Sequence, residues 1–506
     1  LDDQNMPLIG VNIVVKGKTG VGAITNIDGN FTLEVNQGDA IEVSYIGYAP
    51  QTLKVTDNNI YNIQLSADAE LLEEVVVTAL GIKRKSKALG YNLTEVKSDE
   101  ITTVKDANFV NSLTGKVAGL QINSSSSGIG GSTKVVMRGV KSISKSNNVL
   151  YVVDGVPLNN TNGGDVEKNQ GFYTAAPKGE GIADFNPEDI ESMSVLTGPA
   201  AAALYGSNAA NGAILITTKK GAAGKPKITL SHNTDFSNPF VTPRFQNTYG
   251  NKPGEFSSWG DKLATPSSYD PLNFFRTGYN TTTALSISLG NEKNQTFASA
   301  SSTTAEGIIP NNEYQRYNFT VRNTSNFFND RMTLDLGFSY VIQKDQNMLS
   351  QGQYFNPIVP LYLFPRGEDF TPYRMYERYD EGRQLMTQHW PYGEMGMAMQ
   401  NPYWIINRNM FNNDRDRYMA NAGLKYKVFD WMDISGRVRI DNANTRHTKK
   451  LYASTDAKFA QNKGYYGDRK DVDKQLYADF LVNINKRFND FDLTANVGAS
   501  IQDVSM

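Results

Sequence analysis

Past residue 225 the chain repeats one pattern, in which apolar or aromatic residues stand at every second position over runs of ten or more residues. The clearest run alternates through Met332, Leu334, Leu336, Phe338, Tyr340 and Ile342. Because successive side chains of a strand point to opposite faces, this run predicts a β-strand with one apolar and one polar face. Ordinary strands average about 5–6 residues, whereas a tilted strand needs about 9–11 residues to cross a bilayer. The long alternating runs therefore favour membrane-spanning strands.

The connections between these runs alternate in length. Nine strands are expected, near residues 226–238, 281–290, 294–305, 313–326, 331–344, 415–428, 432–443, 473–487 and 491–502. Short joints, such as Asn291 to Lys293, alternate with longer ones, of which 345–414 is the longest. An outer-membrane β-barrel has short turns on the periplasmic side and long loops outside. A soluble β-sandwich also alternates faces, but it has no reason to sort its loops by end, so the pattern favours the barrel.

The same alternation assigns a face to individual residues. Leu336 and Val497 fall on the apolar side, which would face lipid, and Asp335 and Asn496 fall on the other side. We therefore expect arginine to be costly at the first pair of positions and tolerated at the second.

Composition argues against several other classes of protein. Across 506 residues, 50 Lys and Arg balance 52 Asp and Glu without a basic block, so no nucleic-acid partner is expected. Cysteine is absent, which removes disulfides and thiolate metal sites. The three histidines, His232, His389 and His447, lack metal-ligand spacing. We predict that the chain is not an enzyme and has no cofactor.

Residues 1–67 alternate short strand-like runs with turns and predict a small β-sandwich. Asp28-Gly29 is a signal for a tight turn between two of these runs. Asp28 and Asp39 are candidates for calcium binding, but two acidic residues in turns far more often stabilise the turns themselves. The segment Phe31 to Val35 is among the predicted strands.

The next segment, 68–87, raises a question about pairing. Its centre, Val75, Val76, Val77, Thr78 and Ala79, has strand-forming residues between an acidic and a basic cluster. No turn signal pairs this run into a hairpin, so its partner strand is not evident from the neighbouring residues. An ordinary linker strand packed on the following domain is the alternative to a strand that pairs with another protein.

Residues 88–224 predict a mixed α+β domain. Asp106 to Val117 has apolar residues at helical spacing, and 124–133 and 159–181 are rich in Gly, Ser and Asn and predict loops. Short strands are expected at Lys134–Arg138, Val149–Val153, Val195–Thr197 and Ala213–Thr218. The barrel strands begin after this domain, at about residue 225.

Several motifs resemble the TonB-dependent outer-membrane transporters of the SusC/RagA type from Bacteroidota. Pro7 to Val35 resembles the family's N-terminal extension, a domain related to the regulatory domain of carboxypeptidases, and Glu73 to Lys85 resembles its TonB box. The plug motifs are LTGKVAGLQ, VVMRG, LYVVDGVP and IESMSVLTGPAAAALYGSNAANGAILITTKKG, which begin at residues 113, 135, 150 and 190. The resemblance is dense up to about residue 225 and is one of pattern beyond it.

The resemblance implies a domain order and a location. The expected order is a carboxypeptidase-regulatory-like β-sandwich at 1–67, a linker with the TonB box at 68–87, a plug domain at 88–224 and the first part of a transmembrane β-barrel at 225–506. Proteins of this family close a 22-stranded barrel around the plug, so nine strands would be less than half of it. The expected location is the outer membrane of a Gram-negative Bacteroidota cell, in contact with its lipid.

The resemblance also implies a function and partners. It implies active import of an oligosaccharide or oligopeptide, driven by the periplasmic protein TonB, which would pair with residues 75–79 as an added strand. A SusD-like surface lipoprotein would cap the barrel, and transporter and lid would associate as a dimer of pairs. The alternatives are a TonB-dependent receptor for a siderophore or vitamin-like ligand, and a surface or adhesion protein without transport.

Two sets of residues are candidates for specific contacts. Arg138 and Glu191 lie in or beside short apolar strands of the plug, where a charge needs a partner, so they are candidates for ion pairs between plug and barrel. The alternative is that both are solvated strand ends. Aromatic residues of the long loops stack on sugar rings or grip peptide side chains, and many will instead pack loop on loop. The candidate contacts for substrate or lid are Trp259, Tyr354, Phe355, Trp390, Tyr392, Tyr403 and Trp404.

Overall fold

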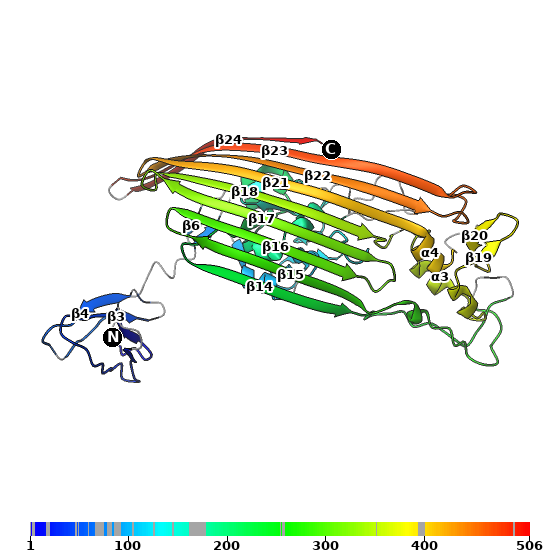
Figure 1. Ribbon diagram of the computed structural model, residues 1–506, viewed down its shortest axis with the longest axis horizontal. Coiled ribbons are helices and arrows are strands. Elements are labelled where there is room, and N and C mark those ends of the chain that lie inside the picture. Colours follow the sequence, from blue (N-terminus) through cyan, green and yellow to red (C-terminus); the bar gives the residue numbers. More distant parts are fainter. Residues whose placement is uncertain are drawn as a thin grey trace. The chain divides into compact units, whose positions relative to one another are not determined.

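The computed structural model forms two compact units, residues 1–92 and residues 93–506 (Figure 1). It describes the chain apart from residues 1, 3–5, 17–20, 46–47, 49, 59, 66–74, 78–82, 86–92, 104–105, 125–126, 144–145, 161–178, 253–254, 256–258, 351, 393–399, 489–490 and 506. In the described part of the chain, no helix is both long and apolar enough to cross a membrane.

The first unit is a small β domain. Its four-stranded antiparallel sheet has the order β2 (Gly22–Ile24), β1 (Asn12–Val15), β3 (Ala40–Ser44) and β4 (Gln51–Lys54). The alternating residues of β1 and β3 are buried, and the segments 31–35 and 61–65 pack alternate side chains onto the same core. The predicted strand at Phe31 to Val35 is thus extended but has no ladder partner among the described residues. Asp39 stabilises a turn, since its carboxylate accepts a hydrogen bond from the Asn36 amide.

The plug domain opens the second unit. Its five-stranded sheet has the order β11 (Val156–Pro157), β10 (Leu150–Val153), β13 (Ala213–Thr218), β12 (Ile190–Leu196) and β7 (Leu93–Lys97). Strands β10 and β13 are parallel, and the other neighbours are antiparallel. A separate pair joins β8 (Leu120–Asn123) to β9 (Lys134–Met137).

Short helices complete the plug. They are α1 (Ser98–Thr102), η3 (Phe109–Leu113), η4 (Gly181–Asp184), η5 (Pro187–Asp189), α2 (Gly198–Tyr205) and η6 (Gly206–Ala209). The segment predicted as helical at 106–117 is a single 3₁₀ turn, η3, which begins where the Asn108 side chain accepts the Val110 amide. Phe109, Val110 and Leu113 still face the core. The buried positions were therefore predicted correctly, although the helix is shorter than expected and of the 3₁₀ type.

The rest of the unit is one antiparallel sheet of nine strands, hereafter the wall. The strands are β14 (Gly224–Ser237), β15 (Gly278–Gly290), β16 (Asn294–Glu306), β17 (Glu313–Phe327), β18 (Met332–Gln346), β21 (Asn409–Phe429), β22 (Met432–Leu451), β23 (Tyr465–Phe488) and β24 (Phe491–Ser505). Each pairs with its neighbours in chain order, and tight turns alternate with long loops. The mainly β fold predicted from the sequence is confirmed. The last strands are longer than expected, up to 24 residues in β23.

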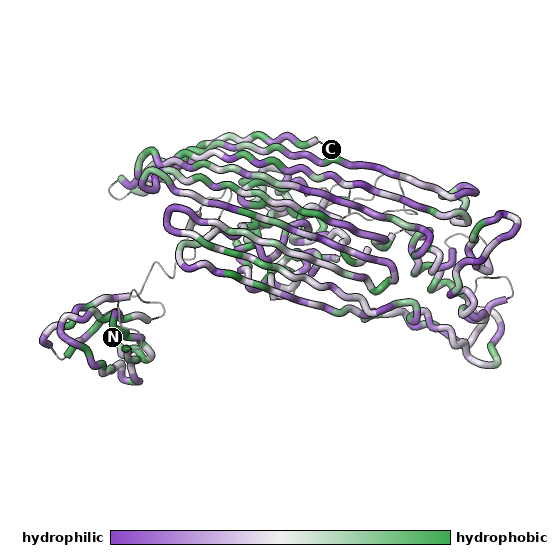
Figure 2. Tube along the Cα trace, viewed as in Figure 1, coloured by the Kyte–Doolittle hydropathy of each residue, from purple (hydrophilic) through white to green (hydrophobic). Residues whose placement is uncertain are grey.

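The two faces of the wall differ in chemistry. Hydrophobic residues recur along the middle of the strands (Figure 2), and those on the outer face are exposed, among them Leu336 at 44% and Val497 at 68%. The alternate residues of the inner face meet the plug, where Val341 and Met419 are buried. Asp335 lies on this inner face, as predicted, but it is the partner of Arg322, so arginine there would not be tolerated.

The long loops hold small elements of their own. These are η7 (Pro271–Phe274), α3 (Ile358–Leu363), η8 (Thr371–Arg374), β19 (Glu377–Asp380), β20 (Leu385–Gln388) and α4 (Pro402–Arg408). Many aromatic side chains of the loops at 238–277 and 347–408 pack against one another in one hydrophobic cluster, the loop cluster. Its central members are Phe274, Leu361, Phe364, Phe370 and Trp390.

Candidate functional site

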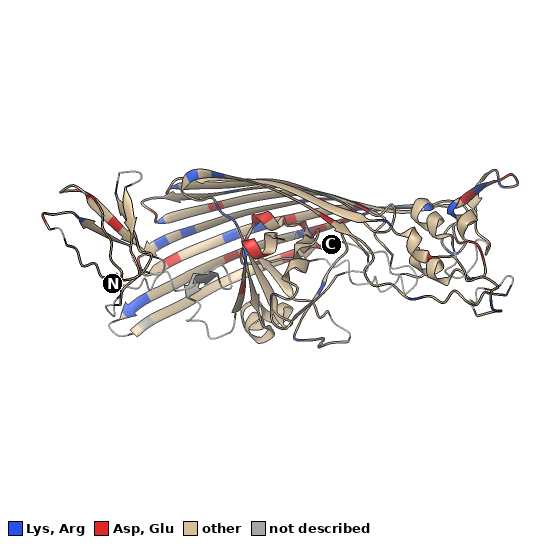
Figure 3. Cartoon of the chain, turned by 90° about the horizontal axis from the view of Figure 1, so that it is seen from below, with Lys and Arg blue, Asp and Glu red and all other residues tan. Residues whose placement is uncertain are grey.

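The surface between plug and wall buries several charged side chains, among them Asp184, Arg322 and Arg417. The plug packs against one face of the sheet, with basic residues along the strands and acidic residues in the plug beside them (Figure 3). A tight hairpin, β10 to β11, brings Asp154 to this surface, because Asp154 and Gly155 both adopt positive φ, 51° and 82°. That geometry is the one an Asp-Gly turn favours between two antiparallel strands. The turn therefore fixes a carboxylate at a set point opposite the wall.

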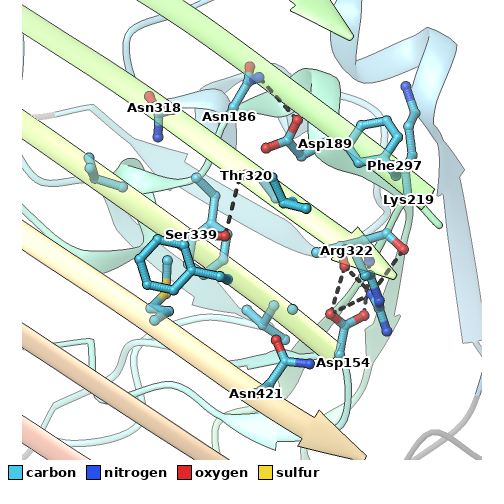
Figure 4. A pocket seen from close by; sticks show the side chains of 18 of the residues that line it. Asp154, Asn186, Asp189, Lys219, Phe297, Asn318, Thr320, Arg322, Ser339 and Asn421 are labelled. Atoms are coloured by element: carbon cyan, nitrogen blue, oxygen red, sulfur yellow. Dashed lines mark hydrogen bonds and ion pairs between the residues drawn. The ribbon is translucent and has the colours of Figure 1, made fainter. Parts of the chain in front are cut away.

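Arg322 of β17 joins this carboxylate to the wall (Figure 4). Its Nε and Nη2 donate to the two oxygens of Asp335 on β18, both at 2.9 Å, and its Nη1 donates to Asp154 Oδ2 at 3.0 Å. Asp154 also accepts the amide and hydroxyl of Thr218, at 3.0 and 2.7 Å. Lys220 Nζ lies 2.7 Å from Asp335. A planar guanidinium thus holds one carboxylate of the plug and one of the wall at once.

Arg417 of β21 forms a second such junction in greater isolation from solvent. Its Nε and Nη2 donate to Asp441 of β22 at 2.8 and 2.6 Å, and its Nη1 donates to Asp184 of the plug at 2.7 Å. The Gly181 carbonyl accepts from the same Nη1 at 2.6 Å, and Arg415 adds a second cation 3.0 Å from Asp184. Arg417 is 2% exposed and Asp184 is fully buried. Charges buried this deeply persist only when they are paired and hydrogen-bonded.

Other inward side chains of the wall bind backbone carbonyls of the plug. A buried carbonyl without a donor is costly, so these contacts satisfy plug backbone that the plug's own sheet leaves open. The donor and acceptor pairs are Arg316 with Ala107 at 2.8 Å, Arg437 with Asp154 at 2.6 Å, Arg439 with Val153 at 3.2 Å and Gln475 with Pro157 at 2.7 Å. Side chains of the wall therefore bind both main-chain carbonyls and carboxylates of the plug.

A small cavity of about 50 Å³ lies within this surface (Figure 4). Its charged lining consists of Asp154, Asp184, Asp189, Lys219, Arg322 and Arg439. Asp189 is buried and accepts from Asn186 Nδ2 at 3.2 Å. Burial raises the pKa of Asp189 to about 6, against the opposing effects of its hydrogen bonds and Lys219. The plug therefore presents to the wall a buried carboxyl group whose pKa lies above the ordinary range of aspartate.

Comparison with known proteins gives these domains their names. The family model described as the TonB-dependent Receptor Plug Domain matches residues 85–213, and the model described as the CarboxypepD_reg-like domain matches residues 1–77. The chain is 29% identical to TonB-dependent receptor SusC of Bacteroides thetaiotaomicron, in a match that covers 97% of the chain and 49% of that protein. The chain is thus similar to SusC/RagA-type TonB-dependent receptors in its N-terminal domain, its plug and its strands.

Two further comparisons agree with this assignment. TonB-dependent receptor P3 of Formosa agariphila is 29% identical, over 88% of the chain and 41% of that protein. The structure of the RagAB peptide importer in the open-open state superposes with a TM-score of 0.61 at 19% identity, over 85% of the chain and 50% of that chain, which shows a shared fold. The chain spans about half the length of the curated relatives that it matches.

The strand expected to be the TonB box has a partner within the chain. Val75, Val76 and Val77 form β5, which pairs antiparallel with β6 (Lys83–Lys85). The expectation that no hairpin forms was wrong, because two strands five residues apart in the chain can pair without a two-residue turn signal. Thr78 and Ala79 lie outside the described residues. The role of 75–79 in binding TonB stays a prediction.

The two plug residues predicted to pair with the barrel are exposed. Neither Arg138 nor Glu191 forms an ion pair within the described part of the chain, and both side chains point away from the core. Ion pairs between plug and wall do exist, but they use Asp154, Asp184 and Lys220 of the plug. The sequence signal that could have identified the wall side is arginine at inward positions of the strands, as in Arg437 and Arg439 of β22.

The aromatic residues predicted to contact substrate or lid fall into two groups. Trp259 is 72% exposed. The other six are buried or half-buried within the loops, and Trp404, at 0% exposure, donates its indole N–H to Thr455. Phe355 and Tyr354 pack on Phe459 in a small cluster of their own. Their contact roles stay predictions, and in the arrangement described only Trp259 offers an exposed ring.

Proposed function

We propose that this chain carries the N-terminal domain, plug and first wall strands of a TonB-dependent importer in the outer membrane. The nutrient would be an oligosaccharide or an oligopeptide, and a SusD-like surface lipoprotein would cap the transporter. The observation that supports this most is the relation to SusC over 97% of the chain, which includes both the plug and the wall.

The topology suggests how a pull on the N-terminal segment would act on the plug. Strand β7 follows β5 and β6 along the chain, and it lies at the edge of the plug sheet, where β12 is its one partner among the described strands. A force applied at Val75 to Val77 would therefore load β7 before any other strand of the plug. An edge strand can leave without breaking the pairs between the remaining strands.

The junctions at Arg322 and Arg417 would resist the same pull. They hold the β10–β11 turn and the η4 segment, which lie later in the chain than β7. Loss of β7 would leave these contacts in place, and only further extraction would break them. The plug would then open from its edge while its centre stays attached to the wall.

The hairpin of β5 with β6 limits how TonB can bind. A strand added from TonB would either extend the free edge of β5 or replace β6, and both routes rely on main-chain hydrogen bonds rather than on particular side chains. Proline tests this directly, because it cannot donate a main-chain hydrogen bond. A β-branched residue would preserve the strand.

The test is uptake by cells that carry the full-length protein with changes in this segment. Deletion of residues 73–79, or Val76→Pro, should abolish growth on the transported nutrient while outer-membrane levels and surface binding stay normal. Val76→Thr is the matched control and should retain uptake. Normal growth of the deletion strain would refute TonB-driven import.

A further inference from the structure

A second, larger cavity lies between the loops at 238–277 and 347–408. Its volume is about 300 Å³. The first loop lines it with residues between Leu263 and Phe274, and the second loop with Leu361, residues between Arg366 and Arg374, and Tyr403 of α4. The cavity combines ring surfaces with charged groups, which is the chemistry of a site for a polar ligand. None of the contacts described so far assigns it a role.

Arg366 is the unusual member of the lining. It is only 4% exposed, and its guanidinium carbon lies 4.5 Å from the ring centre of Phe245 and 4.9 Å from that of Tyr269. Its Nη1 and Nη2 atoms are both buried without a hydrogen-bond partner, and it forms no ion pair with a carboxylate of the described chain. A buried cation in this state is costly unless something pairs with it.

The acidic residues of the cavity are held by other partners. Asp270 accepts the Leu272 amide at 2.9 Å, and Asp369 accepts the Thr371 amide at 2.9 Å. Glu368 accepts Asn251 Nδ2 at 3.0 Å. Backbone amides thus hold Asp270 and Asp369 in turns, and an asparagine side chain holds Glu368. Burial lowers the pKa of the Arg366 guanidinium, and nearby Tyr269 and Asp270 only partly offset this.

The position of Arg366 is fixed before any ligand arrives. The rings of Phe245 and Tyr269 both lie within 5 Å of its guanidinium carbon, and the planar guanidinium keeps its two Nη donors in a fixed relation to each other. The next residue, Gly367, lies so close to Gly250 and Asn251 that a Cβ would stand 2.4 Å from the Asn251 side-chain oxygen. The two loops are therefore in close contact beside the Arg366 guanidinium. A rigid donor pair binds at lower entropic cost than a mobile one.

We propose that this cavity binds a carboxylate of the transported oligomer, with Arg366 as the paired donor and Arg374 as a second cation at the rim. A carboxylate accepts two parallel hydrogen bonds from a guanidinium and matches its geometry. The carboxylate would come from a peptide or from a uronic-acid sugar. This inference rests on the proposed import function, since it names the chemical class of the cargo.

The experiment measures binding by calorimetry at pH 7 with the full-length protein in detergent. The ligands are a tetrapeptide with a free carboxyl terminus and its amide, and a tetragalacturonate and its methyl ester. We expect one acid to bind at least about tenfold more tightly than its neutral form, since a hydrogen bond to a charged group is worth about that factor. Which acid does so identifies the source of the carboxylate.

Variants separate recognition from structure. Arg366→Gln should remove the preference for the acid and leave binding of the neutral form unchanged, and Arg366→Lys should keep part of the preference, because it retains the charge but not the fork. Arg244→Gln, an exposed arginine of the same loop, should change nothing. Equal binding of acid and neutral forms by the unaltered protein would overturn the proposal, as would equal loss of both in Arg366→Gln.

The two proposals fail in different experiments. Calorimetry needs no TonB, so absence of a carboxylate preference would leave import standing if Val76→Pro still abolishes uptake. Uptake by the Val76→Pro strain would refute TonB-driven import, and a tenfold carboxylate preference that Arg366→Gln removes would still show the binding site.

Discussion

Replacing Arg417 with methionine should loosen the plug by removing the cation between two buried carboxylates. Arg417 makes two hydrogen bonds to Asp441 of the wall and one to Asp184 of the plug, at 2.6 to 2.8 Å. In Arg417→Met, Asp441 loses its paired donor, and Asp184 keeps only Arg415, at 3.0 Å. Breaking a buried pair from one side costs about 3–5 kcal/mol. We expect a loss of that size in the free energy of plug opening.

Neutralising all three groups together should cost much less. Asp184→Asn and Asp441→Asn, added to Arg417→Met, leave no uncompensated carboxylate at this junction, and Arg415, which loses Asp184 as its partner, has 11% of its side chain exposed. Replacing buried ion pairs by neutral groups is often close to neutral in stability. The triple variant should therefore be more stable than the single variant. This order distinguishes the penalty of an orphaned charge from a simple loss of contacts.

The assay is native-state hydrogen exchange of the β13 amides, Ala213 to Thr218, in the full-length protein. Strand β13 lies at the centre of the plug sheet, so its exchange reports opening of the plug rather than fraying of an edge. Arg446→Met is the matched control, because Arg446 also makes paired bonds to an aspartate on the next strand, Asp468, but is largely exposed. It should leave β13 exchange unchanged.

Two results would refute this reasoning. The first is an Arg417→Met protein whose β13 opens as rarely as in the unaltered protein. The second is a triple variant that loses as much stability as the single variant, since that would place the energy in contacts rather than in the paired charges.

Three further predictions follow from other parts of the fold. Leu336→Arg and Val497→Arg should impair assembly, since arginine on the lipid face near the midplane costs about 2–4 kcal/mol, and normal heat-modifiability would contradict this. Asp189→Asn should stabilise the plug above pH 6, by up to about 3 kcal/mol. Because the pKa of Asp189 is raised in the folded state, its contribution makes the unaltered protein less stable as pH rises from about 4 to 6. If Asp189→Asn left the pH dependence of unfolding unchanged, this contribution would be refuted. Gly155→Ala should lower the free energy of unfolding by about 1–2 kcal/mol, because Gly155 has a φ of 82° that alanine adopts only with strain. It should also speed hydrogen exchange in β13, because the strained turn would displace Asp154.

The sequence by itself determined the wall and most of its geometry. Side chains of a strand alternate with a period of two, so the positions of Leu336 and Phe338 predict an apolar outer face from the strand's own sequence. Turn chemistry is equally local, and Asp154-Gly155 forms a tight hairpin because both positions accept positive φ. These features depend on neighbouring residues, and the strands, connections and faces were accordingly predicted close to where they lie.

The sequence was less informative about pairing within short segments. The hairpin of β5 and β6 was missed because three residues on each side, joined by 78–82, have no strong turn signal. The helical spacing at 106–117 was real, but packing settled it as one 3₁₀ turn. In both cases a few residues carry too little local preference to select one structure, and their surroundings decide.

Only the tertiary structure decided which charges meet. Arg417 and Asp184 are 233 residues apart, and Arg322 and Asp154 are 168 apart, so no local pattern links them. The same holds for Arg366, whose burial between Phe245 and Tyr269 requires two loops to close on each other. A charged side chain in the sequence carries no sign of its burial or its partner. Both depend on how distant segments pack, because a charge is stable in the interior only where the fold supplies its counter-charge.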